Sequence, residues 1–536
     1  VYAPVGNHEE LLPYLVRRLL ENGSNSSFIN QLTDKQTDLD ELVENPCRRV
    51  EATDCRPHRH IPLPVDLYGD ERRNAIGWDL SDADVVNEME TKLRQVCAHS
   101  WQAAARVGGD DRQGESVALL NPADSAQAVG RVCETDRQDV ERALALAADA
   151  ALPWDAAGGN KRATILLAAA DRFEEKAPEL IARVIREGGR TLRDAIAEVR
   201  EAVDFCRYYA LQAKQEFERP RSLPGPTGEK NELQLHGRGV FACISPWNFP
   251  LAIFVGQIAA ALAAGNSVLA KPARQTPLTG YHTICLLHEA GVPADVLHFL
   301  PGSGAAIGAQ ILPDRRLSGV AFTGSTDTAW KIQRALADRQ GAIVPLIAET
   351  GGQNVMIADS SALPEQLVVD VLQSAFNSAG QRCSALRVLF VQNEIAARVI
   401  RLLAAAMQEI QIGDPLLLAS DVGPLIDQDA ARSLQPHVAR LQREARLLQR
   451  VDPPQNLQAG CFFPLQAFEL ESLALLEKEV FGPVLHVVRY RADKLEQVID
   501  AVNNTGYGLT LGVHSRIEET WLRVQARARV GNLYIN

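Results

Sequence analysis

Short apolar runs and longer alanine-rich stretches alternate through the middle of the chain. The apolar runs at residues 239–243 and 320–322 are bounded by glycine, proline or polar residues, a pattern typical of buried strands. The stretches at 143–151 and 162–173 are rich in alanine, which has the highest helix propensity, and they predict helices. This alternation over residues 115–350 predicts an α/β fold with a Rossmann-type dinucleotide domain.

The N-terminal stretch has helical spacing instead. Tyr14, Arg17, Arg18 and Glu21 recur at intervals that place them on or near one face of a helix. Adjacent guanidinium groups are suited to binding a small carboxylate, although a solvated helix face accounts for the same spacing.

Residues 31–95 are polar and punctuated by proline, which predicts a connector with a helix at 82–97. Four residues of metal-ligating type also lie in this segment: Cys47, Cys55, His58 and His60. Their spacing fits no common zinc pattern and arginines lie between them, so we expect no metal site.

Composition limits the classes of function. The chain has 536 residues, too many for one compact core, and two or three domains are expected. A formal net charge of −12 argues against a nucleic-acid-binding surface. Nine cysteines without a C-x-x-C pair do not suggest a disulfide framework, and a reducing cytoplasm suits a reactive thiol. No apolar run reaches the roughly 18 residues of a membrane span.

Two short motifs carry candidate chemistry. Cys383 lies in the glycine-led turn Gly-Gln-Arg-Cys-Ser-Ala, and Glu349 stands just ahead of two glycines. A thiol that adds to a carbonyl and a carboxylate that activates water are the two groups needed for covalent oxidation of an aldehyde. Each motif also has a structural explanation, because cysteine is often a small buried apolar residue and Glu-Thr-Gly-Gly suits the end of a strand.

Three further segments supply groups that fit this chemistry and a dinucleotide. Asn248 lies among bulky residues near two prolines, which suits a rigidly held amide that faces an oxyanion. Lys271 ends an apolar run, and its ammonium is suited to a ribose or a phosphate. Gly324 and Ser325 form a turn between a predicted strand and helix, where a pyrophosphate can meet a helix N-terminus.

Residues 477–484 add a carboxylate and an aromatic ring, those of Glu479 and Phe481. These segments, in this order, resemble those of the aldehyde dehydrogenase superfamily over residues 95–536. The resemblance implies a role for each position: Cys383 as nucleophile, Glu349 as general base, Asn248 and the backbone N–H of Cys383 as the oxyanion hole, Lys271 and Glu479 as ribose contacts, and Gly324, Ser325, Trp247 and Phe481 as the lining of the cofactor cleft.

The resemblance also implies a domain organisation. Residues 96–349 form the NAD-binding domain, with an arm near 221–237 that helps to pair subunits, so that the full-length protein is expected to be a homo-oligomer. Residues 350–478 form the catalytic domain, and 479–536 return to the NAD-binding domain.

The N-terminal helix narrows the resemblance further. It is similar to the last helix of the proline dehydrogenase (β/α)₈ barrel, which precedes an aldehyde dehydrogenase in the bifunctional proline utilization A family. The resemblance implies that the parent protein oxidises proline with FAD, with a site that includes Tyr14, Arg17, Arg18 and Glu21. It also implies the substrate L-glutamate γ-semialdehyde, in equilibrium with pyrroline-5-carboxylate, which is oxidised to L-glutamate with NAD.

Both ends of the chain differ from that family. A complete barrel needs about 250 residues, and residues 1–30 supply only its end, so we expect no flavin binding or proline oxidation by this polypeptide alone. Residues 531–536 look like a strand that continues in the family into a glycine-rich loop that anchors the substrate. We therefore expect the fragment to hold its aldehyde poorly.

The choice of coenzyme turns on one substitution. The superfamily often has glutamate three residues after the lysine, whereas Arg274 stands here, and arginine suits the 2′-phosphate of NADP. We expect NAD because the proline utilization A resemblance implies it, with NADP as the alternative. Three other functions stay open: a dehydrogenase for another aldehyde, an acylating enzyme that uses coenzyme A and would not need Glu349, and a non-catalytic scaffold.

Overall fold

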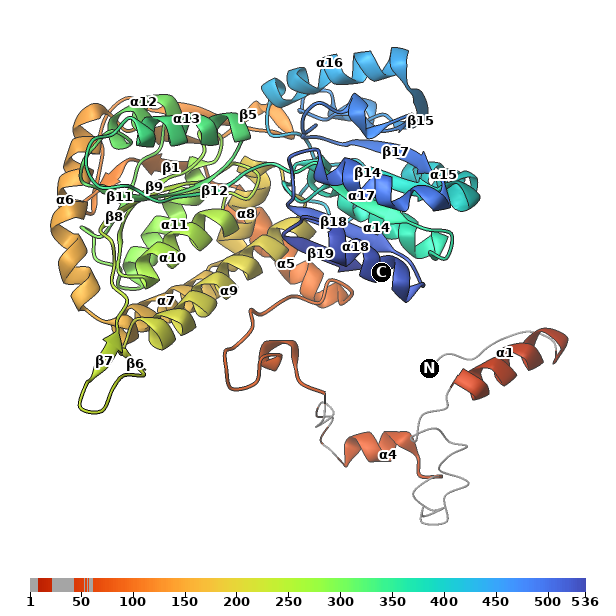
Figure 1. The fold of residues 1–536 in the computed structure, drawn as a ribbon, viewed down its shortest axis with the longest axis horizontal. Helices are drawn as coiled ribbons and strands as arrows, with labels where there is room; N and C mark the ends of the chain where they lie inside the picture. Colours follow the sequence, from red (N-terminus) through yellow and green to blue (C-terminus); the bar gives the residue numbers. More distant parts are fainter. Residues whose placement is uncertain (1–7, 22–42, 53, 55, 57–60) are drawn as a thin grey trace. The chain divides into compact units, whose positions relative to one another are not determined.

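The computed structural model describes residues 8–21, 43–52, 54, 56 and 61–536 (Figure 1). The chain separates into two compact units, Val1–Leu67 and Tyr68–Asn536. In the first unit, α1 (His8–Glu21) confirms the helix predicted around Tyr14, whose side chain is exposed. The side chains of Arg17, Arg18 and Glu21 on this helix lie outside the described residues.

The other described elements of the first unit are short helices. α4 (Pro46–Glu51) is capped by Asn45, whose side chain accepts a hydrogen bond from the Cys47 N–H at 2.9 Å. A 3₁₀ helix (Pro64–Asp66) follows. Of the four candidate metal ligands, Cys47 is described and exposed, whereas the other three lie outside the described residues.

The second unit contains two seven-stranded sheets. The strands of the first are β2 (Arg106–Val107), β3 (Asp110–Asp111), β8 (Val240–Ile244), β9 (Ser267–Lys271), β10 (Leu297–Phe299), β11 (Leu317–Thr323) and β12 (Leu346–Glu349). They are ordered β12-β11-β8-β9-β10-β2-β3, and the five strands from β12 to β10 run parallel. The predicted strands at 239–243 and 320–322 fall within β8 and β11, which confirms them apart from the exact ends.

Helices cover both faces of the first sheet (Figure 1). They are α6 (Arg137–Ala156), α7 (Gly159–Glu175), α8 (Ala177–Gly188), α9 (Leu192–Glu216), α10 (Ala252–Ala263), α11 (Pro277–Glu289), α12 (Gly304–Ile311) and α13 (Thr326–Ala337). Alternate side chains of β8 enter different cores: Phe241 packs with α7 to α11, and Ala242 packs with α6, α12 and α13. Burial on both faces explains why the strands are continuously apolar in sequence. The helices predicted at 143–151 and 162–173 lie within α6 and α7 and are confirmed.

The second sheet lies beside the first and has its own core. Its strands are β13 (Asn354–Ala358), β14 (Leu386–Gln392), β15 (Arg446–Val451), β16 (Leu465–Leu470), β17 (Val484–Tyr490), β18 (Thr510–His514) and β19 (Asn532–Ile535). They are ordered β15-β16-β17-β14-β13-β18-β19, all parallel to their neighbours except β15. Its helices are α14 (Pro364–Phe376), α15 (Asn393–Gln408), α16 (Gln428–Glu444), α17 (Leu495–Asn503) and α18 (Glu518–Arg527).

This topology corrects the expected boundary at 479. Residues 479–536 do not return to the first sheet, because β17, β18 and β19 all pair within the second sheet. Val484, Val487 and Leu511 are buried in the second core. The sequence pattern of a buried parallel strand does not reveal which sheet the strand joins.

The expected connector is also shorter than predicted. α5 (Ala83–Cys97) confirms the predicted helix, and Asp82 is its N-cap. Its side chains Met89 and Leu93 are buried in the core of the first sheet. The Ala75 N–H donates to the Asp204 carboxylate at 2.9 Å. Residues 68–95 therefore pack as part of the second unit.

Two smaller elements complete the second unit. β1 (Trp101–Ala104), β4 (Val117–Asn121) and β5 (Asp124–Cys133) form a three-stranded sheet in the order β1-β5-β4. β6 (Arg221–Leu223) and β7 (Asn231–Leu233) form an antiparallel hairpin in the predicted arm. Among the described residues, no helix combines the length and apolar character needed to cross a bilayer.

Candidate active site

The carboxyl ends of the parallel strands in the first sheet carry several predicted site residues. Lys271 is the last residue of β9, and Glu349 is the last residue of β12. Asn248 and Ser325 follow the ends of β8 and β11. The strand order reverses between β8 and β11, and such switch points are where open α/β sheets bind ligands.

The second sheet contributes residues from the amino ends of its strands. Cys383 lies in the turn that enters β14, while Glu479 and Phe481 precede β17. Loops at the amino ends of these strands therefore meet loops at the carboxyl ends of the first sheet. Between them lies a pocket of about 410 Å³.

The pocket gathers seven of the predicted residues: Trp247, Asn248, Gly324, Ser325, Cys383, Glu479 and Phe481. Trp247 and Phe481 meet edge to face across it, with ring centroids 5.6 Å apart. Asn248 is buried, which suits a fixed amide. Lys271 and Glu349 do not line this pocket, although Thr350 and Gly351, which follow Glu349, do.

The turn that carries Cys383 has an unusual backbone. Ser378, Ala379 and Gly380 have φ values of 56°, 55° and 66°, so three successive residues adopt the left-handed conformation. Non-glycine residues in this conformation cost free energy and persist only where neighbours hold them. The Ser378 hydroxyl donates to the buried Asp194 carboxylate at 2.7 Å, which fixes the turn from α9.

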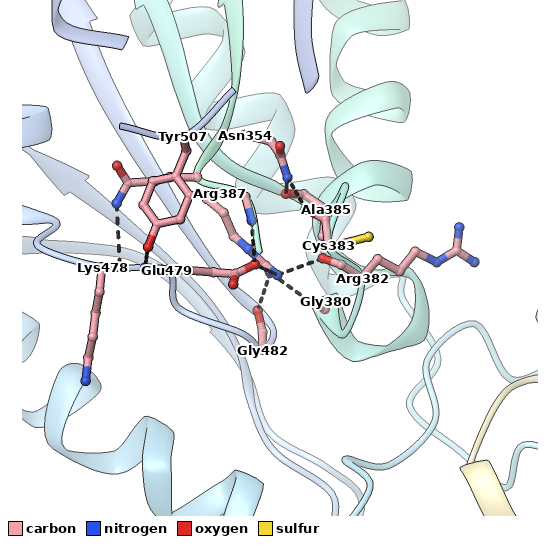
Figure 2. A network of polar contacts seen from close by, with 12 residues as sticks. Asn354, Gly380, Arg382, Cys383, Ala385, Arg387, Lys478, Glu479, Gly482 and Tyr507 are labelled. Carbon is pink, nitrogen blue, oxygen red and sulfur yellow. Dashed lines mark hydrogen bonds and ion pairs between the residues drawn. The ribbon is translucent and has the colours of Figure 1, made fainter. Parts of the chain in front are cut away.

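Arg382, next to Cys383, donates to the same carboxylate. Its Nη2 donates to Asp194 Oδ1 at 2.6 Å, and its Nε donates to the Ser378 hydroxyl at 3.0 Å. Figure 2 shows Arg382 extending away from the Arg387–Glu479 contact. Arg382 therefore braces the turn from one side.

Arg387 braces the turn from the other side (Figure 2). Its fully buried guanidinium donates to the carbonyls of Gly380 at 2.7 Å and Arg382 at 2.9 Å, and it lies 3.5 Å from Glu479 Oε1. The Asn354 amide donates to the Cys383 carbonyl at 2.6 Å. These contacts fix the backbone on both sides of the thiol.

The Cys383 thiol is not activated by its surroundings alone. Burial raises its pKa, and the negative charge of Glu479 raises it further. The backbone N–H groups of Ser384 and Cys383 and the charge of Arg387 act in the opposite direction. Glu479 lies against the backbone of Gly351, where a Cβ would overlap the carboxylate and displace it.

Lys271 and Glu349 differ in exposure. Burial lowers the pKa of Lys271 to about 8, and its ammonium donates to the Pro272 carbonyl at 2.7 Å. Glu349 is exposed, and its carbonyl accepts a hydrogen bond from the Gly324 N–H at 3.1 Å.

The third wall of the pocket carries no signal in the sequence. It comes from the start of α16 and the residues before it: Ile426, Asp427, Asp429, Ala430 and Ser433. Gln275 donates to Asp427 at 3.1 Å across the gap between the two sheets. The amphipathic pattern of α16 predicts only a helix at the surface, and no motif marks these positions.

Comparison with known proteins decides the family. A sequence profile of the Aldehyde dehydrogenase family matches residues 110–536. The chain belongs to the aldehyde dehydrogenase family. In this aldehyde dehydrogenase, residues 1–31 also match a profile of Proline dehydrogenase.

Individual relatives agree with the profiles. The aldehyde dehydrogenase is 48% identical over 550 residues to the bifunctional protein PutA of Salmonella typhimurium, which covers 100% of this chain and 41% of that protein. It is 33% identical over 487 residues to a 1-pyrroline-5-carboxylate dehydrogenase of Geobacillus thermodenitrificans, covering 90% of this chain and 91% of the relative. The crystal structure of 1-pyrroline-5-carboxylate dehydrogenase from Thermus with bound NAD superposes with a TM-score of 0.81 at 30% identity, covering 89% and 91% of the two chains. The chain thus spans less than half the length of the PutA protein that it matches.

Proposed function

We propose that this aldehyde dehydrogenase oxidises L-glutamate γ-semialdehyde, the open form of pyrroline-5-carboxylate, to L-glutamate with NAD. One observation carries the chemistry: Cys383 and Asn248 line the same pocket between the two sheets. The names of the Geobacillus and Thermus relatives, which match this chain over nearly their whole length, support the substrate.

The residues at the carboxyl edge of the first sheet fit a dinucleotide. Gly324 lets the backbone lie close to the Phe322 ring, since a Cβ there would stand 2.7 Å from it. Ser325 caps α13, leaving the helix N-terminus beside the pocket. Gly304 likewise keeps the space beside Lys271 free of a side chain. Trp247, Ser325, Lys271, Glu479 and Phe481 would hold NAD, which supplies a hydride acceptor when bound.

The chemistry of the chain's own residues begins at the thiol. The Cys383 thiol gives its proton to water, and Sγ forms a C–S bond to the aldehyde carbon while the carbonyl π-electron pair moves to oxygen. The Asn248 amide donates a hydrogen bond to that oxyanion, an interaction whose removal typically costs about 2.7–4 kcal/mol of barrier. The C–H bond at that carbon then breaks as hydride passes to the hydride acceptor, the C=O bond re-forms, and a thioester links the substrate to Cys383.

Glu349 completes the proposed cycle. Its carboxylate takes a proton from water as the water oxygen attacks the thioester carbon, and the C–S bond breaks to release L-glutamate and the thiolate. The Glu349 side chain is exposed at the end of β12, and the next two residues, Thr350 and Gly351, line the pocket. The side chain must therefore rotate toward these residues to reach the thioester.

NADH formation from pyrroline-5-carboxylate and NAD, followed by absorbance, tests the proposal on this chain. Cys383→Ala is expected to lose all measurable turnover and to retain NAD binding in calorimetry. Cys97→Ala, at a half-buried cysteine of α5, is the matched control and should keep both. Turnover of other aldehydes but not this one would support the family and contradict the substrate, and full activity of Cys383→Ala would contradict the mechanism.

The proposal extends to the parent protein. A longer polypeptide would add proline oxidation with FAD, for which Tyr14, Arg17, Arg18 and Glu21 on α1 are candidate contacts, supported by the match of residues 1–31. A cytoplasmic location is supported by the need to keep the Cys383 thiol reduced. Self-association through the β6–β7 hairpin is supported by its exposed leucines, Leu223 and Leu233.

A further inference from the structure

Arg274 stands where the superfamily often has glutamate. Its side chain contacts a residue that is distant in the sequence. The Arg274 guanidinium Nε lies 3.3 Å from Glu134 Oε1, although 140 residues separate them. Glu134 follows the last residue of β5, and Arg274 follows β9. The pair therefore joins the end of β5, in the three-stranded sheet, to the residues that follow β9 in the first sheet.

The backbone holds Glu134 in place. The N–H and the hydroxyl of Thr135 both donate to the Pro301 carbonyl, at 2.9 and 2.7 Å. A Cβ on Gly302 would stand 3.4 Å from the Glu134 Cβ, in ordinary contact. Glu134 is thus fixed beside the turn that leads from β10 into α12.

Lys271 belongs to the same group of charges. Its ammonium lies near Gly304 at the start of α12, and a Cβ at Gly304 would be 3.7 Å from the Nζ. The charge of Glu134 is the one that stabilises the buried ammonium. One carboxylate therefore faces two cations, and the group carries a net charge of +1.

We propose that Glu134 sets the preference for NAD over NADP. This inference rests on the proposed binding of a dinucleotide at the carboxyl ends of the strands of the first sheet. In dinucleotide enzymes an acidic side chain accepts a hydrogen bond from the ribose 2′-hydroxyl, and an arginine accommodates a 2′-phosphate. Here the acid follows β5 rather than β9. The Glu134 carboxylate supplies the acceptor for the ribose 2′-hydroxyl. It also pairs with Arg274, whose guanidinium would otherwise attract the 2′-phosphate.

Charge explains the direction of the preference. A 2′-phosphate placed beside Arg274 meets the Glu134 carboxylate as well, and unpaired like charges in contact oppose binding. Removing the carboxylate charge leaves Lys271 and Arg274 with a net charge of +2, which favours the phosphate. The ion pair itself is exposed and contributes little to stability, so it can be changed without unfolding the protein.

The test measures binding of ADP-ribose and 2′-phospho-ADP-ribose by calorimetry, so that neither the thiol nor hydride transfer enters the readout. Wild type is expected to favour ADP-ribose. Glu134→Gln is expected to shift the affinity ratio at least about tenfold toward the phosphorylated ligand. Adding Arg274→Gln to Glu134→Gln should reverse most of that shift.

The matched control is Glu141→Gln. Glu141 is an exposed glutamate paired with an arginine, Arg316 at 2.8 Å, and that arginine immediately precedes β11 at the amino edge of the sheet. Its substitution removes the same charge and should leave the ratio unchanged. An equal shift in both variants, or none in Glu134→Gln, overturns the role of Glu134 while leaving the proposed function intact. Absence of binding by NAD, NADP and both ADP-riboses in wild type overturns the proposed function and this inference together.

Discussion

Glu349 lies one residue before the pocket lining, with its side chain exposed. Because we assign it to deacylation, Glu349→Gln should still form the thioester. A pre-steady-state burst of about one NADH per site should therefore remain, while steady-state turnover falls about 10²–10⁴-fold. Stopped-flow absorbance separates the two phases. Glu365→Gln, at an exposed glutamate of α14, serves as control. Loss of the burst would place the glutamate before thioester formation.

The charge of Glu479 acts on the Cys383 thiol. Burial is the first cause of the raised pKa of Cys383 and the Glu479 charge the second, so Glu479→Gln should lower that pKa while leaving it raised by burial. The pH profile of Cys383 alkylation by iodoacetamide, followed by mass spectrometry of its peptide, measures the shift. Glu477→Gln, at an exposed glutamate two residues away, should leave the profile unchanged. An unaltered profile in Glu479→Gln would show that the carboxylate does not reach the thiol electrostatically.

At the scale of elements, one helix caps another. α11 begins at Thr276 and Pro277 without a capping side chain of its own. Instead Glu187 of α8 accepts from the N–H groups of Leu278 at 2.6 Å and Thr279 at 2.8 Å, and from the Thr279 hydroxyl. The glutamate is fully buried and replaces a local cap.

Glu187→Ala should destabilise the protein by about 3 kcal/mol, because it leaves buried donors without an acceptor. Burial raises the pKa of Glu187 from 4.5 to about 7 in the folded state. The folded protein then binds the proton more tightly than the unfolded chain, so the contribution of Glu187 is present below pH 4.5 and declines as the pH rises to about 7.

Urea unfolding at pH 5 and pH 8 measures both effects. The difference in unfolding free energy between wild type and Glu187→Ala should be larger at pH 5. Glu141→Ala, at an exposed glutamate of α6, should show little change at either pH. A difference that grows with pH would mean that the buried carboxylate remains charged throughout this range.

At the scale of the whole molecule, the β6–β7 hairpin presents apolar side chains to solvent. Leu223 and Leu233 are 41% and 47% exposed. If this hairpin joins two copies, Leu223→Glu combined with Leu233→Glu should weaken self-association at least about tenfold, because each copy would place charges in an apolar contact. Analytical ultracentrifugation measures the change. Leu152→Glu, at an exposed leucine of α6, is the control. Unchanged association in the double variant would place the contact elsewhere.

Much of this architecture could be predicted because local patterns encode it. Buried strands such as β8 are apolar along their whole length, and Asp82 marks the start of α5. Short motifs likewise pointed to Cys383 and Asn248 as candidates, because the residues that flank each of them are adjacent in the sequence. The contacts that hold these residues could not be predicted in the same way. Glu134 and Arg274 are 140 residues apart, and their pairing depends on how β5 and β9 are placed in three dimensions.

The same reason explains the wrong boundary at 479. A strand such as β17 is apolar because it is buried on both faces, and either sheet would impose that pattern. The order of strands in a sheet is set by crossover connections, which leave no periodic signal in sequence. The wall contributed by α16 was missed for a related reason, because Asp427 becomes part of the pocket only when the two sheets meet.

The meeting of the carboxyl edge of one sheet with the amino edge of the other has a consequence for how such enzymes diversify. Each sheet has its own apolar packing, and most residues that line the pocket lie outside it. A mutation in the wall that α16 contributes, such as one at Ser433, can therefore change the shape of the pocket while the loops at the strand ends of the first sheet stay as they are. A new substrate can thus be accepted without a change in the apolar packing of either sheet.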